Sequence, residues 1–421
     1  MALRSRPLPA VVFLAALCGC SEGPSPASDA GLGAADVGPP DAGPMCPAEG
    51  SAQPDPRGDS AGAVDPVTGY LWIFGGDTGP TANCRTTPVH RDDTWRYDPV
   101  CDRWTRVDGA GPSPRARAAY ALDSRRRRLM VFGGRFRAAT MGNYTHLRDL
   151  WSLDLATGVW SPVEASGGPS ARSNAAMAYD PAGDRLVLFG GNNNPSGLSF
   201  TPQRDTWVFD LAAGSWQRLD AAGPTARLFH GAVVAEGSLW VYGGGGANAF
   251  VGPFMGDLWR LDLSAGSWSE VAVTGDTAGL AQRINPALAP APTGGGVVVV
   301  AGHDDGALGN RNDIVAVSAD GEARVVRAGD RLVRQGNGFC DFPADFTAPD
   351  LDGPERRSAF VFALDPVRGR ALVYGGKTDC GLAGDVWALD LATGTWSPQR
   401  ATSDGLSCIR AGRTGCTALC Q

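Results

Sequence analysis

The sequence predicts an all-β protein in which six similar units, each of four short strands, form a closed array. Two repeated features support this prediction. The first is a Gly-Gly pair that ends an apolar run, found at Gly75-Gly76, Gly133-Gly134, Gly190-Gly191, Gly243-Gly244 and Gly375-Gly376, with Ala301-Gly302 as a weaker sixth copy. The second is a pair of tryptophans nine residues apart, found at Trp95/Trp104, Trp151/Trp160, Trp207/Trp216, Trp259/Trp268 and Trp387/Trp396. A period of roughly 50 residues indicates a stacked or radial array.

The first half of each unit begins with an arginine and ends at the Gly-Gly pair. The six arginines are Arg57, Arg115, Arg172, Arg227, Arg283 and Arg357. A run of alternating or small residues follows, such as 118–122, and then a turn, such as Asp65-Pro66. A buried strand, such as 71–74, then leads into the glycines. Glycine permits a positive φ or a close approach of backbone, which explains why it follows this strand.

The second half of each unit contains an Asp-x-Trp motif and a second tryptophan strand. The motif occurs at Asp93/Trp95, Asp149/Trp151, Asp205/Trp207, Asp257/Trp259 and Asp385/Trp387. Each unit therefore has four β-rich runs separated by turn residues, without helical periodicity. Four-stranded units with this period are typical of propeller blades, in which large aromatic side chains fill the wedge between neighbouring sheets.

The order of arginine, hydrophobic strand, Gly-Gly and two spaced aromatics resembles the kelch repeat over about residues 57–399. This resemblance implies a six-bladed kelch-type β-propeller within residues 51–400. The fifth unit, 283–326, is degenerate, because Val315 replaces its first tryptophan and the second is missing. The repeat has the same phase at both ends, so we expect no exchange of strands to close the ring.

Residues 1–20 resemble the signal peptide of a bacterial lipoprotein. Arg4 and Arg6 precede an apolar run that is too short to span a bilayer. The segment ends in Leu17-Cys18-Gly19-Cys20, in which the small residue before Cys20 favours Cys20 as the lipidated residue. Ser21 favours the outer membrane, on its periplasmic or its surface side. The alternative is an ordinary secretory signal that ends in cysteines.

Residues 21–50 contain mainly Ala, Gly, Pro, Ser and Asp, so we expect a disordered tether. The propeller would follow it, and residues 401–421 would form a cysteine-rich tail. Contact with the membrane is expected only through the lipid anchor. The net charge of −7 and the lack of a basic stripe argue against nucleic acid as a partner, and we expect a monomer.

Eight cysteines follow the signal segment: Cys46, Cys84, Cys101, Cys340, Cys380, Cys408, Cys416 and Cys420. An even number in an exported chain predicts disulfide bonds. Cys84 could pair locally with Cys101, and we hypothesise that Cys46 pairs with the tail and fastens the ring. Cys416 and Cys420 have no second close pair and no nearby histidine, so no zinc site is expected.

The sequence contains no hydrolase, metalloprotease, calcium-loop or phosphate-loop motif, so we expect no metal and no cofactor. Two enzymatic alternatives stay open. A kelch-related copper oxidase uses paired histidines and tyrosines with a Tyr-Cys crosslink, but here only Tyr144 and His146 are neighbours and no free cysteine is evident. A family of six-bladed kelch proteins isomerises sialic acid, which suggests an exported sugar-modifying enzyme of the mutarotase or epimerase type. The candidates for its general base are Glu164, Glu236, Glu270 and Glu355.

Ligand binding is the function that the sequence favours. The six repeat arginines either pair with the Asp-x-Trp carboxylates or form an anion-attracting channel mouth. Arginines outside the repeat and aromatics in the long loops between second and third strands are better candidates, since long loops on a rigid scaffold often bind ligands. These candidates are Arg117, Phe136, Tyr144, His146, Phe200, Phe250, Phe254 and Arg356. We therefore predict a non-catalytic scaffold in the cell envelope that engages protein or glycan ligands through one propeller face.

Overall fold

The computed structural model describes residues 46, 52–79, 81–82, 85–139, 141–304, 309–334, 347–379 and 381–401. The chain divides into two compact units, Met1–Pro47 and Ala48–Gln421, and the second unit contains all the strands. The predicted signal peptide, the tether apart from Cys46, and the tail after residue 401 lie outside the described residues and stay predictions. Within the described residues, no helix is both long enough and apolar enough to span a bilayer.

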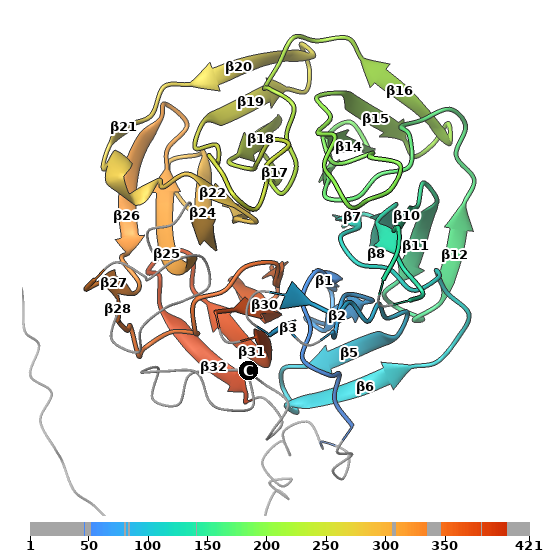
Figure 1. Ribbon diagram of the computed structural model, residues 1–421, viewed down its shortest axis with the longest axis horizontal. Coiled ribbons are helices and arrows are strands. Elements are labelled where there is room, and N and C mark those ends of the chain that lie inside the picture. The colour runs from blue at the N-terminus through green and yellow to red at the C-terminus, as the bar shows by residue number, and fades with distance from the viewer. Residues whose placement is uncertain are drawn as a thin grey trace, which may run out of the picture. The chain divides into compact units, whose positions relative to one another are not determined.

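Five of the six expected blades are four-stranded antiparallel sheets whose strands follow the chain from the inner edge outwards (Figure 1). Blade 1 contains β1 (Ala61–Val64), β2 (Leu71–Phe74), β5 (Thr94–Asp98) and β6 (Arg103–Val107). Blade 2 contains β7 (Ala119–Asp123), β8 (Arg128–Phe132), β11 (Leu150–Asp154) and β12 (Trp160–Val163). Blade 3 contains β13 (Ala176–Asp180), β14 (Arg185–Phe189), β15 (Thr206–Asp210) and β16 (Ser215–Leu219). Blade 4 contains β17 (Gly231–Ala235), β18 (Ser238–Tyr242), β19 (Leu258–Asp262) and β20 (Ser267–Val271).

The degenerate fifth repeat also folds as a blade. It contains β23 (Ala287–Pro290), β24 (Val297–Asp304), β25 (Asn310–Val317) and β26 (Glu322–Arg327). Its sheet is enlarged by β22 (Arg283–Ile284), which pairs with β24, and by β21 (Thr274–Gly275), which runs parallel to β26. Blade 6 contains β29 (Val361–Asp365), β30 (Arg370–Thr378), β31 (Gly381–Leu389) and β32 (Trp396–Arg400). The prediction of a six-bladed propeller is confirmed.

Short elements lie between the blade strands. Three two-stranded ladders are formed by β3 (Thr81–Ala82) with β4 (Arg85–Thr86), by β9 (Arg135–Phe136) with β10 (Thr145–His146), and by β27 (Arg331–Leu332) with β28 (Thr347–Ala348). A 3-10 turn, η1, spans Thr277–Gly279.

The repeat arginines are buried and form ion pairs with the Asp-x-Trp carboxylates and with Asp313 of blade 5, which confirms the structural interpretation of these residues. In blade 3, Arg172 donates to Asp205 from Nη1 at 2.7 Å and from Nη2 at 2.9 Å, and Nη1 also donates to the carbonyl oxygen of Gly190. Trp207 donates to the same carboxylate at 2.7 Å. The same ion pair joins Arg57 to Asp93, Arg115 to Asp149, Arg227 to Asp257, Arg283 to Asp313 and Arg357 to Asp385, and a tryptophan donor is present in each case except Asp313.

The second glycine of each pair links its blade to the next one. Gly76, at φ +98°, donates its N–H to the carbonyl oxygen of Arg115 at 2.9 Å, and Gly376 closes the series by donating to that of Arg57 at 2.8 Å. A Cβ atom on Gly75 would lie 2.7 Å from the Arg115 carbonyl oxygen. This close approach favours glycine where two blades meet, and Ala301 takes the first position only in blade 5.

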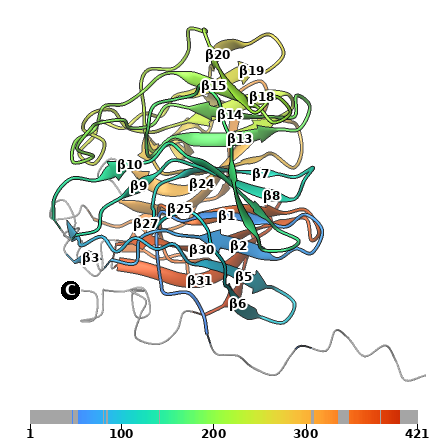
Figure 2. The ribbon, with the colours of Figure 1, turned by 90° about the vertical axis from the view of Figure 1, so that its right-hand side faces the viewer.

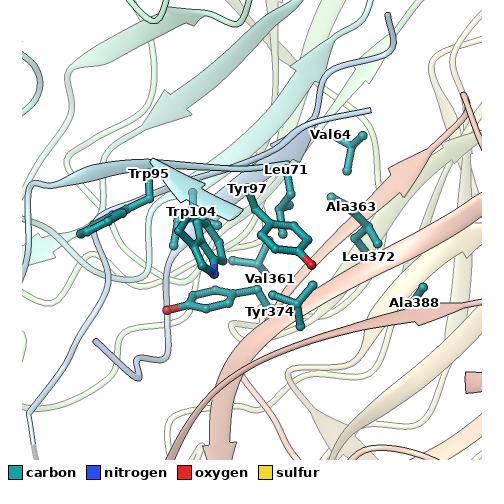
Figure 3. Close-up of a cluster of buried hydrophobic side chains, with 12 residues drawn as sticks. Val64, Leu71, Trp95, Tyr97, Trp104, Val361, Ala363, Leu372, Tyr374 and Ala388 are labelled. Atoms are coloured by element: carbon teal, nitrogen blue, oxygen red, sulfur yellow. The ribbon is translucent and has the colours of Figure 1, made fainter. Parts of the chain in front are cut away.

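Apolar clusters between neighbouring blades form the core. At the seam between blades 6 and 1, Trp104 packs on Tyr97 of its own blade and on Tyr374 of blade 6, with ring centroids 5.1 and 5.0 Å apart (Figure 3). At the same seam, the Tyr374 hydroxyl donates to the carbonyl oxygen of Asp55 at 3.1 Å. The sheets of blades 1 and 6 each contain strands from one continuous part of the chain, so the ring closes without strand exchange, as expected.

Two of the predicted disulfide cysteines lie in the described residues. Cys46 and Cys101 are both disulfide-bonded. The other six predicted cysteines lie outside the described residues. The proposed pairing of Cys46 with a cysteine of the tail therefore stays a prediction.

Candidate functional site

The loops between the second and third strands of the blades lie on one face of the propeller, which we call the loop face. Figure 2 shows the short strands β3, β9 and β10 together at this end, on the left of that view. The inner strands also begin here, because each second strand runs antiparallel to its first. Loops and channel mouth therefore share one face.

A cavity of about 220 Å³ lies at the centre of the ring, where the inner strands begin. Its lining includes the residue two positions after each repeat arginine, and we call these six residues the channel ring. They are Asp59, Arg117, Asn174, Phe229, Asn285 and Ala359. All six have φ between 51° and 60°, the left-handed region that residues other than glycine rarely adopt. A second cavity of about 310 Å³, with a more apolar lining, lies further along the inner strands.

Backbone hydrogen bonds connect the channel ring from blade to blade. The N–H of Arg117 donates to the carbonyl oxygen of Asp59 at 3.0 Å, and that of Asn174 donates to Arg117 at 3.0 Å. Phe229 and Asn285 continue the series around the ring. The six positions carry five different residue types, with asparagine at both Asn174 and Asn285, so the mouth is asymmetric although its backbone repeats. The fixed offset from the repeat arginines is the sequence signal that could have identified this ring.

Asp59 and Arg117 form an ion pair in the channel ring, at 3.1 Å, and Lys377 of blade 6 also donates to Asp59. Burial alone would raise the pKa of Asp59, but the charges of Arg117 and Lys377 more than reverse this and hold that pKa well below its usual range. Asp59 is therefore a fixed anion and a poor general base. Among the described residues, the buried Nη1 atom of Arg117 has no hydrogen-bond partner.

Three of the predicted ligand-binding residues meet beside this ion pair. The Arg117 guanidinium lies over the rings of Phe229 and Phe250, at 5.0 and 5.5 Å from their centroids. Phe200 packs on both rings, at 5.8 and 5.3 Å. The structure thus brings together Arg117, Phe200 and Phe250, and it adds Phe229, which the sequence analysis did not single out.

Three more predicted residues, Phe136, Tyr144 and His146, gather over blades 1 and 2. The Tyr144 ring lies 5.9 Å from that of His90, which is also 5.9 Å from Phe136. His146 stands opposite Arg135 in the β9–β10 ladder. Burial, reinforced by the charge of Arg135, lowers the pKa of His146 to about 4, so this histidine is neutral at neutral pH.

The last two predicted residues, Phe254 and Arg356, are buried among residues of the scaffold. Phe254 is only 4% exposed, in an apolar cluster with Leu228, Ala249 and Ile284. Arg356 is fully buried: it donates to the carbonyl oxygen of Asn310 and forms ion pairs with Asp330 and Asp379. Its position next to a repeat arginine places it inside the blade rather than at the channel mouth. Both side chains are therefore enclosed by the fold, and their role in binding stays a prediction.

Large apolar side chains are exposed at the tips of the loops on blades 2, 3 and 4. Met141 is 81% exposed, Leu198 56%, Phe250 39% and Val251 82%. Exposed apolar residues that gather around a polar centre are typical of interaction surfaces.

The structure provides little for the enzymatic alternatives. Glu164, Glu236 and Glu270 are exposed, Glu355 is buried, and none of the four is among the residues that line the central cavity. Within the described residues, no three His, Cys, Asp or Glu side chains are grouped as a metal ion would require.

Comparisons with known proteins agree with the fold. Residues 61–284, more than half of the chain, match the family model described as the KLHDC2/KLHL20/DRC7 Kelch-repeats domain. Kelch domain-containing protein 10 of Xenopus tropicalis is 24% identical over 348 residues, which are 80% of this chain and 78% of that protein. The Xenopus laevis protein of the same name is 27% identical over 50% of this chain and 52% of its own length. Acyl-CoA-binding domain-containing protein 4 of Arabidopsis thaliana is 29% identical over 53% of this chain, but only 31% of that protein is covered.

Proposed function

Because this chain belongs to the kelch-repeat family, we propose that it is a non-catalytic scaffold of a bacterial cell envelope that binds protein or glycan ligands on its loop face. The observation that carries this proposal is the group formed by Arg117, Phe200, Phe229 and Phe250 beside the central cavity. Aromatic and arginine side chains are the usual anchors of binding surfaces.

The residue types on the loop face favour a protein ligand over a glycan. Met141, Leu198 and Val251 are apolar, non-aromatic and highly exposed. Leu198 lies in the same loop as Phe200, and Val251 lies in the same loop as Phe250. An apolar partner surface would gain free energy by covering them, at about 25 cal/mol per Å² of buried apolar area. Sugar hydroxyls would gain much less from such contacts.

A non-catalytic function is supported by the state of the acidic and basic groups. Each repeat aspartate forms an ion pair with a repeat arginine, as Asp205 does with Arg172. The carboxylate in the channel ring, Asp59, is kept negatively charged by Arg117 and Lys377. An enzyme that acts on sugars would need a carboxylate or histidine able to exchange a proton near neutral pH.

Attachment to the envelope is part of the proposal and is supported by the sequence alone. The basic start, the short apolar run and Gly19-Cys20 favour lipidation of Cys20. Cys20→Ala should prevent the incorporation of labelled palmitate and release the protein from the membrane fraction. A Cys20→Ala protein that still carries label and stays in the membrane would contradict this.

The binding function can be tested by screening the purified protein against peptide and glycan arrays. We expect hits that weaken with Phe250→Ser, since Phe250 is exposed and close to Arg117. Conversion of sugar anomers by the wild-type protein, or a hit unaffected by Phe250→Ser and by Val251→Ser, would contradict the proposal.

A further inference from the structure

We propose that a cluster of basic and aromatic residues on blades 1 and 2 binds the phosphate or sulfate group of a ligand. This cluster, which we call the Tyr144 cluster, consists of His90, Arg135, Arg137, Tyr144 and His146. The inference rests on the proposed function, because it assigns a chemical class to part of what the loop face binds.

Two arginines of the Tyr144 cluster hold the same tyrosine ring. The Arg135 guanidinium lies 3.9 Å from the centroid of Tyr144, and that of Arg137 lies 4.3 Å from it. Arg135 is only 8% exposed. Stacking on the ring fixes the guanidinium planes but uses none of their N–H groups.

Few polar side-chain atoms of the cluster have partners in the described residues: Nη1 of Arg137 donates to the carbonyl oxygen of Gly142 at 3.0 Å, and Nδ1 of His90 lies 3.4 Å from the backbone of Arg137. The Nε atoms of Arg135 and Arg137, the Nε2 atom of His90 and both ring nitrogens of His146 are buried without hydrogen-bond partners in the described residues. A buried donor without an acceptor costs about 1–3 kcal/mol, and more when it is charged. So many unused nitrogens in one place indicate a missing acceptor.

Nearby carboxylates do not supply that acceptor. Asp59 is bound to Arg117 and Lys377. Asp77 accepts the backbone N–H groups of Gly79 and Val89 on Oδ1, at 2.9 and 2.8 Å. In the described residues, Arg135 has no ion-pair partner, and its burial, together with the charge of Arg117, lowers its pKa to about 9.

The expected ligand group is a tetrahedral oxyanion rather than a carboxylate. The donors come from four side chains, and each neutral histidine can offer one N–H. A phosphate or sulfate ester has three terminal oxygens to receive them, whereas a carboxylate has two. Cationic guanidinium groups with bound anions form short, charge-assisted hydrogen bonds.

The cluster is held in place by its neighbours, so little ordering is needed on binding. The N–H of Tyr144 donates to the carbonyl oxygen of Ser196 in the blade 3 loop at 2.8 Å. Gly197 of that loop packs so closely that a Cβ atom there would lie 2.6 Å from the Cβ atom of Tyr144. Preorganisation of this kind favours affinity.

The test is calorimetric titration of the full-length protein with methyl phosphate and with methyl sulfate at constant ionic strength, with acetate as the comparison anion. We expect at least one ester to bind more tightly than acetate, and the tighter of the two identifies the ester. Arg135→Met should weaken that binding by about tenfold or more, the loss of one charged contact. Arg91→Met is the control, because Arg91 lies on the same face but is half-exposed and paired with Asp55 at 2.8 Å.

Several results would overturn the inference. They are no binding of either ester, acetate binding at least as tightly, or equal weakening by Arg91→Met. A second readout needs no ligand: Arg135→Met should raise the unfolding temperature, since it removes a buried unpaired cation, and a fall would show that Arg135 has a structural partner. If array ligands bind the wild-type protein but neither ester does, this inference is refuted while the proposed binding function is still supported.

Discussion

At the scale of single residues, the repeat assigns most charged side chains to the scaffold. Each repeat arginine places a guanidinium between a carboxylate and a glycine carbonyl oxygen, as Arg172 does with Asp205 and Gly190. In blade 5, where Val315 replaces the tryptophan donor, Arg311 donates to Asp313 instead, at 2.7 Å from Nη2 and 2.9 Å from Nε. The carboxylate keeps its third partner although the motif is lost.

Removing one partner of a buried pair should be costly. Arg172→Met removes the ion-pair partner of Asp205 and leaves Trp207 as its side-chain donor, and we expect the free energy of unfolding to fall by about 3–5 kcal/mol. Urea denaturation would measure this. Arg106→Met should change stability little, because Arg106 and Asp108 are exposed and 3.9 Å apart. Equal effects of the two variants would contradict the structural role of the repeat arginines.

The same pairs predict how stability depends on pH. Burial would raise the pKa of Asp205, but hydrogen bonds from Arg172 and its charge reverse this, so the folded pKa lies below the unfolded one. The pKa values of the other five Asp-x-Trp-type carboxylates, Asp93, Asp149, Asp257, Asp313 and Asp385, are lowered in the same way. Their contribution is complete above about pH 4 and is lost as the pH falls through the folded values. The urea midpoint should therefore drop steeply below about pH 4, and a midpoint that is unchanged down to pH 2.5 would argue against it.

The sequence predicted the scaffold residues better than the ligand-binding residues. Arginine, aspartate and tryptophan repeat at fixed positions, so their pairing could be inferred. Phe254 and Arg356 stood out for their residue type, but burial decides their roles, and burial of one loop residue depends on neighbouring blades. The sequence did not indicate Arg135 as a binding residue. Its lack of an ion-pair partner in the described residues becomes clear only when the partners of the nearby carboxylates, Asp59 and Asp77, are known.

At the scale of elements, the Gly-Gly pair sets where blades can touch. Five copies have glycine at the first position, at φ between 64° and 69°, whereas blade 5 has Ala301 at φ +53°. The alanine is tolerated there at the cost of a strained backbone. The degenerate repeat could be recognised as a blade from its sequence, but the added strands β21 and β22 could not, since two-residue pairings have no pattern of their own.

Substitutions at this position should act in opposite directions. Ala301→Gly should stabilise the protein by about 1 kcal/mol, because it relieves the left-handed alanine. Gly190→Ala should destabilise it by more than that, since its Cβ atom would lie 2.7 Å from the Arg227 carbonyl oxygen and 2.9 Å from the His230 ring. Thermal unfolding of both variants checks this, and a stabilising Gly190→Ala would show that the blade contact is loose.

At the scale of the whole ring, the seam that closes the propeller is packed in the same way as the contacts between consecutive blades. The seam between blades 6 and 1 has its own tryptophan, Trp104, between Tyr97 and Tyr374. Trp216 occupies the equivalent place between Phe209 and Phe132, within the series of blades. The number of blades and the lack of strand exchange followed from the sequence. The side chains that pack across the closing seam needed the structure, because Trp104 and Tyr374 are about 270 residues apart in the sequence.

The two tryptophans form a matched test of closure. Trp104→Ala and Trp216→Ala should each lower the free energy of unfolding by about 3–5 kcal/mol, the usual cost of such a truncation in a core. Chemical denaturation would compare them with disulfides intact. A much smaller effect for Trp104→Ala would mean that the seam is held by something other than packing.

The central claim is that ligands bind on the loop face, where side chains depart from the repeat. The most direct measurement is the affinity of an array-selected ligand for two variants with exposed substitutions on opposite faces. Phe250→Ser changes the loop face, and Leu364→Ser changes the lining of the second cavity, where Leu364 is 37% exposed. We predict that Phe250→Ser weakens binding by about tenfold or more while Leu364→Ser leaves it unchanged. Loss of binding with Leu364→Ser and not with Phe250→Ser would contradict the account.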